Sequence, residues 1–566
     1  MTRRIGWCVL IVAIIVVGPL FAGGQKEGAS SSQAAVSAPG ELPLVKTPTT
    51  LTALIEPFGN ITDITTNAYT KWMEQKTGVH LDFQVVPQTA DSSSKIALIL
   101  SSGKLPDMII GAAMPSGWQE TYGGPKGVLL PLNDLIQQHG FYLKQVIQQD
   151  PAYLADSVLS DGQIYMLGAW EECYHCSVAE KMWMNTDWLK KLNLKMPTTT
   201  AEFENVLKAF KAGDPNGDGQ ADEIPLSGAL NTWHSTLDGF LMNAFIYDDG
   251  QNRMNVDASG KVIPAFSQPQ FREGLKYMHQ LYAEGLLDPQ AFVQNLSQLQ
   301  QLVMGPHVLV GAAMVGHRGM MTTNEYSPQS FAYEVVPPLK GPNGVQFSGY
   351  FPYSPHTDGS DAAITRACKN PALAFKWLDY QFSQDASISN WNGIQGVDWN
   401  PAKPGEIGRD GKPALFEYVN GPQNNPVAQS QQNRAWVHTG PYFMPAHWFG
   451  GGAIEQGKFE YETFLYGASD PYVPFAPKIV MPNAMPFLPS DAKIVATMQQ
   501  QMNDFVYSAV AKFTTGQLDI TSDSDWQQYL DQLNSMGLPD YTKAYQNGFS
   551  LWKKDVDAGL GMLTSK

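Results

Sequence analysis

The sequence predicts an α/β fold built from two regions in which strands and helices alternate. The first region begins with a strand-like run at residues 50–58, followed by a helix over residues 67–78 and a second strand over residues 79–87. A second region of the same kind starts near Lys181. Alternation of strands and helices is typical of a mainly parallel sheet covered by helices on both faces, so we expect such a sheet in each region.

Each element of the first region has its own signal. Residues 79–85 read Val-x-Leu-x-Phe-x-Val, and this alternation is typical of a strand with one buried face. Gly78, directly before them, closes the preceding helix, because glycine readily adopts the left-handed conformation found at helix ends. A further helix over residues 94–100 leads into LPDMIIG, which contains a short buried strand.

The second region holds the clearest helix in the sequence. Thr199 and Glu202 form the Thr-x-x-Glu pattern of a capping box at its start. Residues 182–185 before this helix, and residues 308–316 and 331–341 after it, are strand-like. The apolar residues of the helix fall on one face, at Phe203, Val206, Leu207 and Phe210.

The last third of the chain divides into loops and helices. Residues 400–489 are rich in glycine, proline and aromatic residues and show little periodicity. We expect long loops there, packed on a scaffold, where binding residues are often found. Residues 493–513 and 525–537 return to helical patterns.

The N-terminus has the three parts of a secretory signal. Arg3 and Arg4 precede an apolar run at residues 5–17, a Gly-Pro pair breaks that run, and Leu-Phe-Ala at residues 20–22 puts a small residue at the cleavage position. An uncleaved anchor is the alternative, but about 13 apolar residues are short against the roughly 20 that a spanning helix needs. We therefore predict that residues 1–22 are a signal peptide that is removed on export.

Export has two further consequences for the mature chain. No cysteine follows the apolar run, and Cys8 lies too early to become a lipid-modified first residue, so a soluble periplasmic protein is favoured over a lipoprotein. Residues 23–47 are mostly small and polar. We expect them to form a flexible leader, because they carry too little apolar surface to pack.

Composition indicates a large soluble protein that does not bind polyanions. The 566 residues are 43% hydrophobic and 16% charged, enough for more than one core, and the formal net charge is −16. A field of that sign repels nucleic acid and anionic lipid, so neither is an expected partner. The 14 tryptophans and 23 tyrosines exceed what cores need, because indole and phenol rings favour sites with one wet edge.

Three cysteines remain after export. Cys173 and Cys176 flank His175 in a Cys-x-x-Cys pattern, and in an oxidising compartment they would close a small disulfide loop and leave Cys368 buried and free. A redox site would need a thioredoxin-like strand and helix around it, and a zinc site would need a second ligand pair at suitable spacing. A structural disulfide or inert thiols are therefore favoured, and both remain open at this point.

Six segments along the chain carry a family resemblance. They are SSGKLPDMI, GVLLPLNDLI, DGQIYML, the long block WMNTDWLKKLNLKMPTTTAEFENVLKAFKAGDPNGDGQADEIPLSG, NPALAFKWLDYQFS and AKFTTGQLD. In this order they resemble the family 1 extracellular solute-binding proteins of ABC importers, in particular the large oligosaccharide-binding members, alginate-binding proteins among them. They cover nearly the whole mature chain, and the long block is the most specific.

The resemblance implies a periplasmic-binding-protein fold of two α/β lobes, joined by hinge strands and separated by a ligand cleft. We expect residues 48–168 and 345–398 to form the first lobe, and residues 169–344 and 399–566 to form the second lobe with its helical C-terminal part. The resemblance also implies an oligosaccharide ligand captured by closure of the lobes, a permease of an ABC importer in the inner membrane as partner, and no catalysis. We expect the protein to be a monomer.

The sharpest chemical motif lies within the long block, in the segment DPNGDGQADE. It places oxygen ligands at alternate positions, as Ca²⁺ requires of a single tight turn. Asp214, Asn216 and Asp218 match positions one, three and five of an EF-hand-like loop, and Gly219 matches its turn glycine.

The second half of this motif departs from an EF-hand. Gln220 would offer its backbone carbonyl and Asp222 falls at position nine, but position twelve is Pro225 rather than glutamate. The resemblance to alginate-binding proteins implies that Asp222 and Glu223 complete the charge instead. A solvated turn without metal is the alternative. Because four carboxylates in ten residues repel one another without a cation, we predict a structural Ca²⁺ here.

Catalysis and sensing are the competing functions. Glu171 and Glu172 look like a glycosidase pair, but neighbours on an extended chain point to opposite faces. His317 and His438 are candidate bases for a polysaccharide lyase, although no established catalytic motif accompanies them. A third alternative is a sugar-binding protein that serves a sensor or adheres to a surface polymer.

Aromatic residues in loop-like settings are the candidate ligand contacts. Sugar rings present apolar C–H faces that stack on indole and phenol rings, while their hydroxyls need a few polar groups. Packing in a core or between the lobes is the alternative for each of them. The candidates are Trp118, Trp170, Trp233, His234, Tyr350, Trp391, Trp399, Arg434, Trp436 and Trp448.

Overall fold

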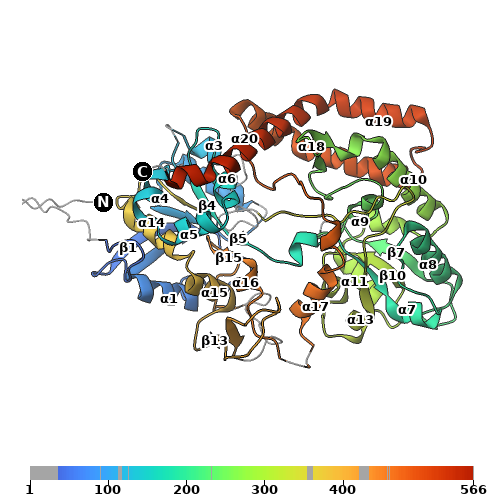
Figure 1. The fold of residues 1–566 in the computed structure, drawn as a ribbon, viewed down its shortest axis with the longest axis horizontal. Helices are drawn as coiled ribbons and strands as arrows, with labels where there is room; N and C mark the ends of the chain where they lie inside the picture. Colours follow the sequence, from blue (N-terminus) through green and yellow to red (C-terminus); the bar gives the residue numbers. More distant parts are fainter. Residues whose placement is uncertain are drawn as a thin grey trace, which may run out of the picture.

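The computed structural model describes residues 36–564 apart from 90, 112–117, 125–126, 231, 354–360, 420–431, 456 and 458. These residues form two α/β lobes that lie side by side, with the chain crossing between them several times (Figure 1). The two-lobed α/β fold expected from the sequence is therefore confirmed. The predicted signal peptide at residues 1–22 lies outside the described residues. None of the described helices is both long and apolar enough to cross a membrane.

The first lobe is built on a five-stranded sheet of order β2-β1-β3-β12-β4. β1 pairs in parallel with β2 and β3, whereas β12 runs antiparallel to β3 and β4. The sheet is mixed because β12 enters it from a distant part of the chain. Its strands are β1 (Thr49–Ile55), β2 (Val79–Val85), β3 (Met108–Ile110), β4 (Met166–Gly168) and β12 (Asp361–Ile364).

Helices pack against this sheet as the sequence predicts. Gly78 closes α1 with a φ of 73°, the left-handed conformation expected of it. Leu51, Ile55 and Trp377 are among the residues of the buried core. The helices of this lobe are α1 (Ala68–Thr77), α2 (Ser92–Ser101), α3 (Trp118–Tyr122), α4 (Asn133–His139), α5 (Tyr142–Gln149), α6 (Ala152–Ser157), α14 (Pro371–Tyr380) and α15 (Gln384–Asn392).

The second lobe has a four-stranded sheet of order β11-β6-β10-β7. β6 runs antiparallel to both β10 and β11, and β7 is parallel to β10. A separate two-stranded hairpin joins β8 and β9. The strands of this lobe are β6 (Met182–Asn185), β7 (Ile224–Gly228), β8 (Met254–Val256), β9 (Val262–Pro264), β10 (Val310–Met314) and β11 (Tyr333–Val336).

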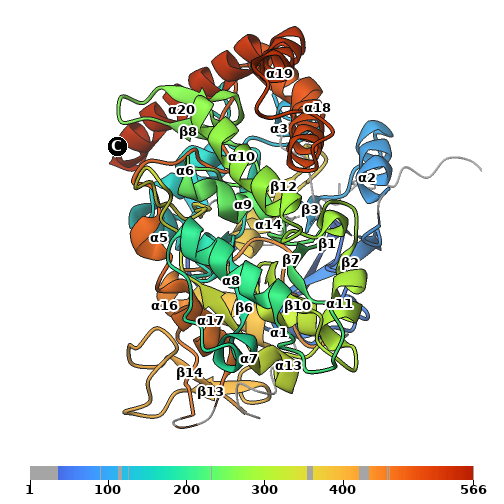
Figure 2. The ribbon, with the colours of Figure 1, turned by 90° about the vertical axis from the view of Figure 1, so that its right-hand side faces the viewer.

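The helices α8 and α10 lie on the outer side of this lobe, facing the viewer in Figure 2, and α11 packs on the other face of the sheet. Short 3-10 turns connect the elements at Cys176–Val178, Met242–Ala244, Ala265–Ser267, Pro289–Phe292 and Val473–Phe475. The helices are α7 (Thr186–Lys191), α8 (Thr200–Ala212), α9 (Leu237–Leu241), α10 (Pro269–Ala283), α11 (Leu296–Met304), α12 (Arg318–Thr322), α13 (Pro328–Phe331), α17 (Tyr461–Ser469), α18 (Pro489–Thr514) and α19 (Asp523–Ser535).

The start of α8 differs in one detail from the predicted capping box. The Thr199 hydroxyl accepts the backbone N–H of Glu202, as expected. The Glu202 carboxylate, however, accepts from the backbone N–H and the hydroxyl of Thr198, one residue earlier than the motif requires. The predicted apolar face is confirmed, because Phe203, Val206, Leu207 and Phe210 are all buried.

The described residues of 399–450, which leave out 420–431, pack on the first lobe, whereas the boundary predicted above assigned them to the second. Strand β13 (Trp399–Pro401) pairs with β14 (Phe416–Tyr418), and β15 (Phe443–Met444) pairs with β5 (Trp170–Glu171). Their buried side chains pack with Ile388 of α15 in one cluster. Helix α16 (Ala446–Phe449) follows, and the chain returns to the second lobe only at α17. Without hydrophobic periodicity, the sequence of this segment does not reveal which lobe it covers.

Residues 36–47 also differ from expectation. Leu44 and Val45 are buried in the core of the first lobe. The backbone N–H of Leu44 donates to the carbonyl of Thr77, at the end of α1. Two apolar residues are thus enough to fix this part of the predicted leader on the first lobe. The rest of the leader lies outside the described residues.

Helix α20 (Leu538–Thr564) connects the lobes a further time. It packs against α18 and α19 of the second lobe, and it also contacts α5 and α6 of the first (Figures 1 and 2). Trp552 of this helix donates its indole N–H to Asp156 of α6. The predicted helical C-terminal part is present, and it reaches over both lobes.

Candidate functional site

A cavity of about 1130 Å³ lies between the two lobes. Each lobe contributes one wall of the cavity. Two segments that cross from one lobe to the other also line it, namely the segment between β5 and β6 and residues 351–353. Ligand pockets typically have volumes of about 300–1,000 Å³ and aromatic walls with a few polar groups. The first lobe contributes the aromatic side chains of Phe58, Trp391, Tyr418, Tyr442 and Phe449, and the second lobe those of Trp233, Tyr326 and Tyr461.

Trp391, near the end of α15, is held by three other side chains of the cavity wall. Its ring centroid lies 4.9 Å from that of His438, 5.6 Å from that of Phe449 and 6.1 Å from that of Tyr442. All three contacts are edge-to-face, a favourable geometry for aromatic pairs. Its Nε1 atom is buried and has no hydrogen-bond partner among the described residues.

Trp233 faces the cavity from the second lobe and keeps 38% of its surface exposed. Its indole ring packs on Gly316, where a Cβ atom would lie only 2.1 Å from the ring. The ring centroid lies 4.6 Å from that of His234 and 6.2 Å from that of His175. Gly316 lies two residues after the end of β10 at Met314, so a single glycine in the sequence makes room for this ring.

His234 lines the cavity, and its imidazole is paired with the buried carboxylate of Glu180. Its Nδ1 atom lies 2.8 Å from the Glu180 carboxylate, and the two side chains are 6% and 2% exposed. Burial raises the pKa of the Glu180 carboxyl. The residue has a φ of 47°, an uncommon left-handed conformation for a histidine. Phe351, 4.4 Å away between ring centroids, packs against the imidazole from the second crossing.

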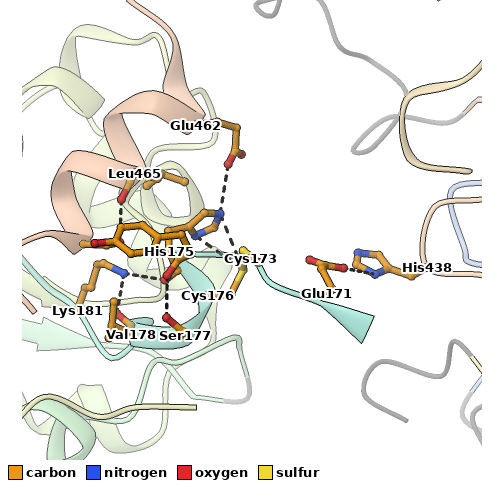
Figure 3. Close-up of a disulfide and its surroundings, with 12 residues drawn as sticks. Glu171, Cys173, His175, Cys176, Ser177, Val178, Lys181, His438, Glu462 and Leu465 are labelled. Atoms are coloured by element: carbon orange, nitrogen blue, oxygen red, sulfur yellow. Dashed lines mark hydrogen bonds and ion pairs between the residues drawn. A yellow bond between two sulfur atoms is a disulfide. The ribbon is translucent and has the colours of Figure 1, made fainter. Parts of the chain in front are cut away.

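The first crossing segment carries a disulfide at the cavity wall. Cys173 and Cys176 are bonded to each other (Figure 3), which decides between the two alternatives that the sequence left open. With His175 they form the one close cluster of metal-binding side chains within the described part of the chain. The two sulfurs are bonded to each other, so neither cysteine can act as a thiolate ligand to zinc. Cys368 is buried, and burial raises the pKa of its thiol to about 12, as expected of an inert cysteine.

His175 joins this crossing to the second lobe. Its Nε2 atom lies 3.2 Å from the carboxylate of Glu462 in α17 (Figure 3). Burial acts to raise the pKa of the Glu462 carboxyl, but the neighbouring His175 and Arg409 outweigh burial and lower that pKa to about 2. Glu462 is therefore a carboxylate at neutral pH, next to His175 and Arg409.

Arg409 and Glu460 form a second buried ion pair at the wall. The guanidinium donates through Nε and Nη2 to the two carboxylate oxygens, at 3.1 and 2.9 Å. The side chains are 7% and 5% exposed. Arg409 precedes β14 on the first-lobe side, and Glu460 is the N-cap of α17, so this pair links segments of the two lobes. The hydroxyl of Tyr418 accepts a further bond from Nη1 at 3.3 Å.

Glu171 and Glu172 do not converge, as predicted for neighbours on an extended chain. Glu171 lines the cavity, accepts the Tyr442 hydroxyl at 2.8 Å and lies 4.0 Å from His438 (Figure 3). Glu172 instead accepts the indole N–H of Trp170 and the backbone N–H of Ala446. The two carboxylates therefore serve different parts of the structure.

The candidate contacts divide into three groups. Trp233, His234 and Trp391 line the cavity. Trp170, Trp399 and Trp436 are buried in cores, and Trp448 and Tyr350 pack against core clusters, so they are not in the cavity wall. Arg434 pairs with Asp398 away from the wall. Trp118 begins α3, and its side chain lies outside the described part of the structure.

Several lining residues were not among the predicted contacts. Phe58, Tyr418, Tyr442 and Phe449 are aromatic residues of loops or of the ends of short elements, like the tryptophans that were predicted. His317 was considered only as a catalytic base, yet its Nδ1 atom lies 2.9 Å from the Tyr461 hydroxyl. Burial lowers the pKa of the His317 imidazole to about 4, so it is neutral at pH 7.

The predicted calcium loop connects α8 to β7 in the second lobe. The carboxylate of Asp214 accepts the backbone N–H groups of Gly217 and Gly219, at 2.7 and 3.1 Å. Asp218 accepts the N–H of Gln220 at 2.8 Å. Gly217 and Gly219 have φ values of 80° and 79°, which explains glycine at both positions. The loop thus folds around its own carboxylates.

Glu223 provides an independent test of whether a cation fits this loop. Both of its carboxylate oxygens are buried and have no hydrogen-bond partner among the described residues. Burial raises the pKa of its carboxyl, and the neighbouring Asp214 and Asp222 raise it further. A buried carboxylate beside two others is unfavourable unless a cation compensates it. The donor set, made only of oxygen atoms, fits Ca²⁺.

Comparison with known proteins agrees with the fold and the cavity. A family model described as bacterial extracellular solute-binding protein matches residues 58–388. The fructooligosaccharide ABC transporter substrate-binding protein FusA of Streptococcus pneumoniae is 29% identical over 503 residues, which cover 85% of this chain and 86% of FusA.

Solved structures extend the comparison. The structure of FusA in complex with kestose has a TM-score of 0.70 at 26% identity and covers 89% of this chain and 100% of that chain. An EF-hand mutant of FusA in complex with fructo-nystose has a TM-score of 0.69 with the same identity and coverage. An HMO-binding solute-binding protein from Bifidobacterium longum infantis has a TM-score of 0.71 at 20% identity and covers 90% and 99%. The alginate-binding protein AlgQ2 without calcium ion has 0.60 at 22%, covering 89% and 99%. The last two show the shared fold.

Proposed function

We propose that this chain, which belongs to the bacterial extracellular solute-binding protein family, captures an oligosaccharide between its lobes and delivers it to the permease of an ABC importer. The observation that supports this ligand class most directly is the interlobe cavity with aromatic side chains from both lobes. Sugar rings stack on such side chains, and the polar groups between them bind hydroxyls. The relative FusA is named as a fructooligosaccharide ABC transporter substrate-binding protein, and this supports the same class of ligand here.

Capture by closure follows from the position of the cavity. Closing empty lobes buries polar groups without partners and orders the crossing segments, so it gains little. A ligand that contacts both Trp391 and Trp233 binds the closed arrangement more tightly than the open one, and only this difference can shift the population. The described crossings at residues 172–181, 337–353 and 450–455 are the segments that we propose to act as hinges.

The proposal assigns binding and no catalysis to the cavity. Its support is that FusA is named as a substrate-binding protein, and that Glu171 and Glu172 have separate partners. Incubation of the purified protein with neutral and uronic oligosaccharides should raise its melting temperature for the sugars it binds. Chromatography of the released sugar should recover it unchanged. Shortened or unsaturated products would instead establish a glycosidase or a lyase.

We also propose a structural Ca²⁺ in the loop between α8 and β7. Its ligands would be Asp214, Asn216, Asp218, the carbonyl of Gln220, Asp222 and Glu223. Support comes from the unpartnered Glu223 carboxylate and from the FusA relative, for which an EF-hand mutant is described. The ion would neutralise the loop and fix it between α8 and β7.

For the location we propose an exported, soluble periplasmic protein that acts as a monomer with its membrane permease. The extracellular family and the predicted signal at residues 1–22 support export. The mature protein from its native host should begin near Gly23, which intact-mass measurement would establish. Retention of residues 1–22, or a diacylglyceryl adduct, would contradict a soluble product.

A further inference from the structure

We infer that the cavity selects an uncharged oligosaccharide and excludes sugars that carry carboxylate, sulfate or phosphate groups. The inference rests on the proposed function and narrows its ligand class. It follows from the ionisable side chains of the wall, because each arginine or histidine among the described lining residues either has a glutamate beside it or is neutral.

Arg409 is the one arginine or lysine among the described residues of the cavity wall. Its two parallel hydrogen bonds to Glu460 use the geometry by which an arginine would otherwise bind a ligand carboxylate. Its remaining terminal nitrogen donates to Tyr418. With 7% of the side chain exposed, the guanidinium has no free edge to offer.

Three of the four histidines of the wall also lie beside a glutamate carboxylate. His175 lies 3.2 Å from the Glu462 carboxylate, and His234 lies 2.8 Å from that of Glu180. His438 lies 4.0 Å from Glu171. The fourth, His317, is buried and neutral at pH 7, with its Nδ1 atom on the Tyr461 hydroxyl. Each of the first three therefore already has a carboxylate of the protein beside it.

The wall holds several carboxylates and a single arginine. Four glutamates, at positions 171, 325, 460 and 462, line the cavity together with Arg409 and four histidines. Burial raises the pKa of the Glu325 carboxyl, and the neighbouring Glu462 raises it further. A ligand anion would lose its hydration without gaining a cation, and it would meet charge of its own sign.

An uncharged sugar finds what its groups need in the same wall. Hydroxyls are hydrogen-bond donors, and carboxylates such as that of Glu171 are strong acceptors for them. Asn252, Asn392 and Asn483 line the cavity and can donate or accept. The ring of Trp391 lines the cavity and offers a surface on which a sugar ring can stack. The wall thus offers polar groups for hydroxyls and aromatic rings for stacking, and neither interaction needs a charge on the ligand.

Isothermal calorimetry with two ligand sets tests this inference. The first set comprises fructo-, galacto-, xylo-, malto- and manno-oligosaccharides, and the second comprises galacturonate, mannuronate and guluronate oligomers. For the tightest neutral sugar, a matched derivative is prepared with one primary hydroxyl oxidised to a carboxylate. We expect binding in the neutral set only, and at least about tenfold weaker binding of the oxidised derivative. The Kd of the neutral sugar should not change between low and high salt, because no charge pair is formed.

A variant that lacks one carboxylate of the wall tests whether charge repulsion, rather than a lost hydrogen bond, weakens the binding of the oxidised sugar. Glu325→Gln removes one carboxylate of the wall and should narrow the difference in Kd between the neutral sugar and its oxidised derivative. Glu273→Gln, on the outer helix α10 with a side chain 52% exposed, should leave that difference unchanged. Tighter binding of uronic oligomers than of every neutral sugar would overturn the inference while leaving oligosaccharide capture intact. Preferred binding of cationic chitosan oligomers would overturn it as well. Binding of no sugar at all would overturn the proposed function and the inference with it.

Discussion

Trp391→Ala is expected to weaken oligosaccharide binding by about 1–3 kcal/mol, which corresponds to a roughly 5- to 150-fold higher Kd. The substitution removes an indole that lies in the cavity wall and is braced by His438, Phe449 and Tyr442. It also removes the buried Nε1 donor, which has no partner among the described residues. Trp233→Ala should cause a loss of the same order, because this ring faces the cavity from the other lobe. Calorimetry on the two variants measures both effects.

The control for these variants is a tryptophan outside the cavity. Trp72 of α1 stacks on Tyr69 and Tyr380, with ring centroids 5.6 and 6.1 Å apart, and does not line the cavity. Trp72→Ala should lower the melting temperature and leave the Kd unchanged. An equal change in Kd for Trp72→Ala and Trp391→Ala would mean that loss of stability, and not loss of a ligand contact, explains the effect.

Removal of calcium is expected to lower the melting temperature of the wild-type protein. A ligand that binds only the folded state stabilises it, by about 2.7 kcal/mol at one hundred times its Kd. EDTA should therefore shift the thermal transition downward, and added Ca²⁺ should restore it. Asp218→Ala removes a predicted ligand in the middle of the loop and should abolish this sensitivity. Metal analysis of the purified protein should find calcium in the wild type.

A matched aspartate distinguishes loss of the ion from loss of a turn. Asp257, also in the second lobe, accepts the backbone N–H groups of Ser259 and Lys261 in an exposed turn. Asp257→Ala loses similar turn hydrogen bonds but should keep the full response to EDTA. If the wild type contains no calcium and does not respond to EDTA, residues 214–223 are only a solvated turn.

The fold could be predicted wherever the hydrophobic pattern was regular. The face of α8 and the strands β1, β2 and β10 follow from period and length, and tertiary packing agrees with them. Residues 399–450 have no such period, so their attachment to the first lobe depends on contacts between distant segments, such as Phe443 with Trp170. Leu44 and Val45 show that two apolar residues fix a segment whose composition suggests a flexible leader.

The kind of side chain that lines the site, aromatic rings with a few polar groups, could be predicted better than the individual residues. An aromatic residue in a glycine-rich loop has the same sequence signal whether it lines a cavity, as Trp391 does, or fills a core, as Trp436 does. The pairing of Arg409 with Glu460 joins segments with no local pattern in common. The charge balance of the cavity depends on such pairs, so the exclusion of anionic sugars could only be inferred from the structure.

Small-angle X-ray scattering with and without the bound oligosaccharide tests the central claim most directly. A sugar that contacts both walls should draw the lobes together, so the radius of gyration should fall on saturation. The fall should be smaller for Trp233→Ala at the same ligand concentration, because a smaller fraction of the variant is bound. A protein that keeps its open dimensions when calorimetry shows it to be saturated would contradict capture by closure of the two lobes.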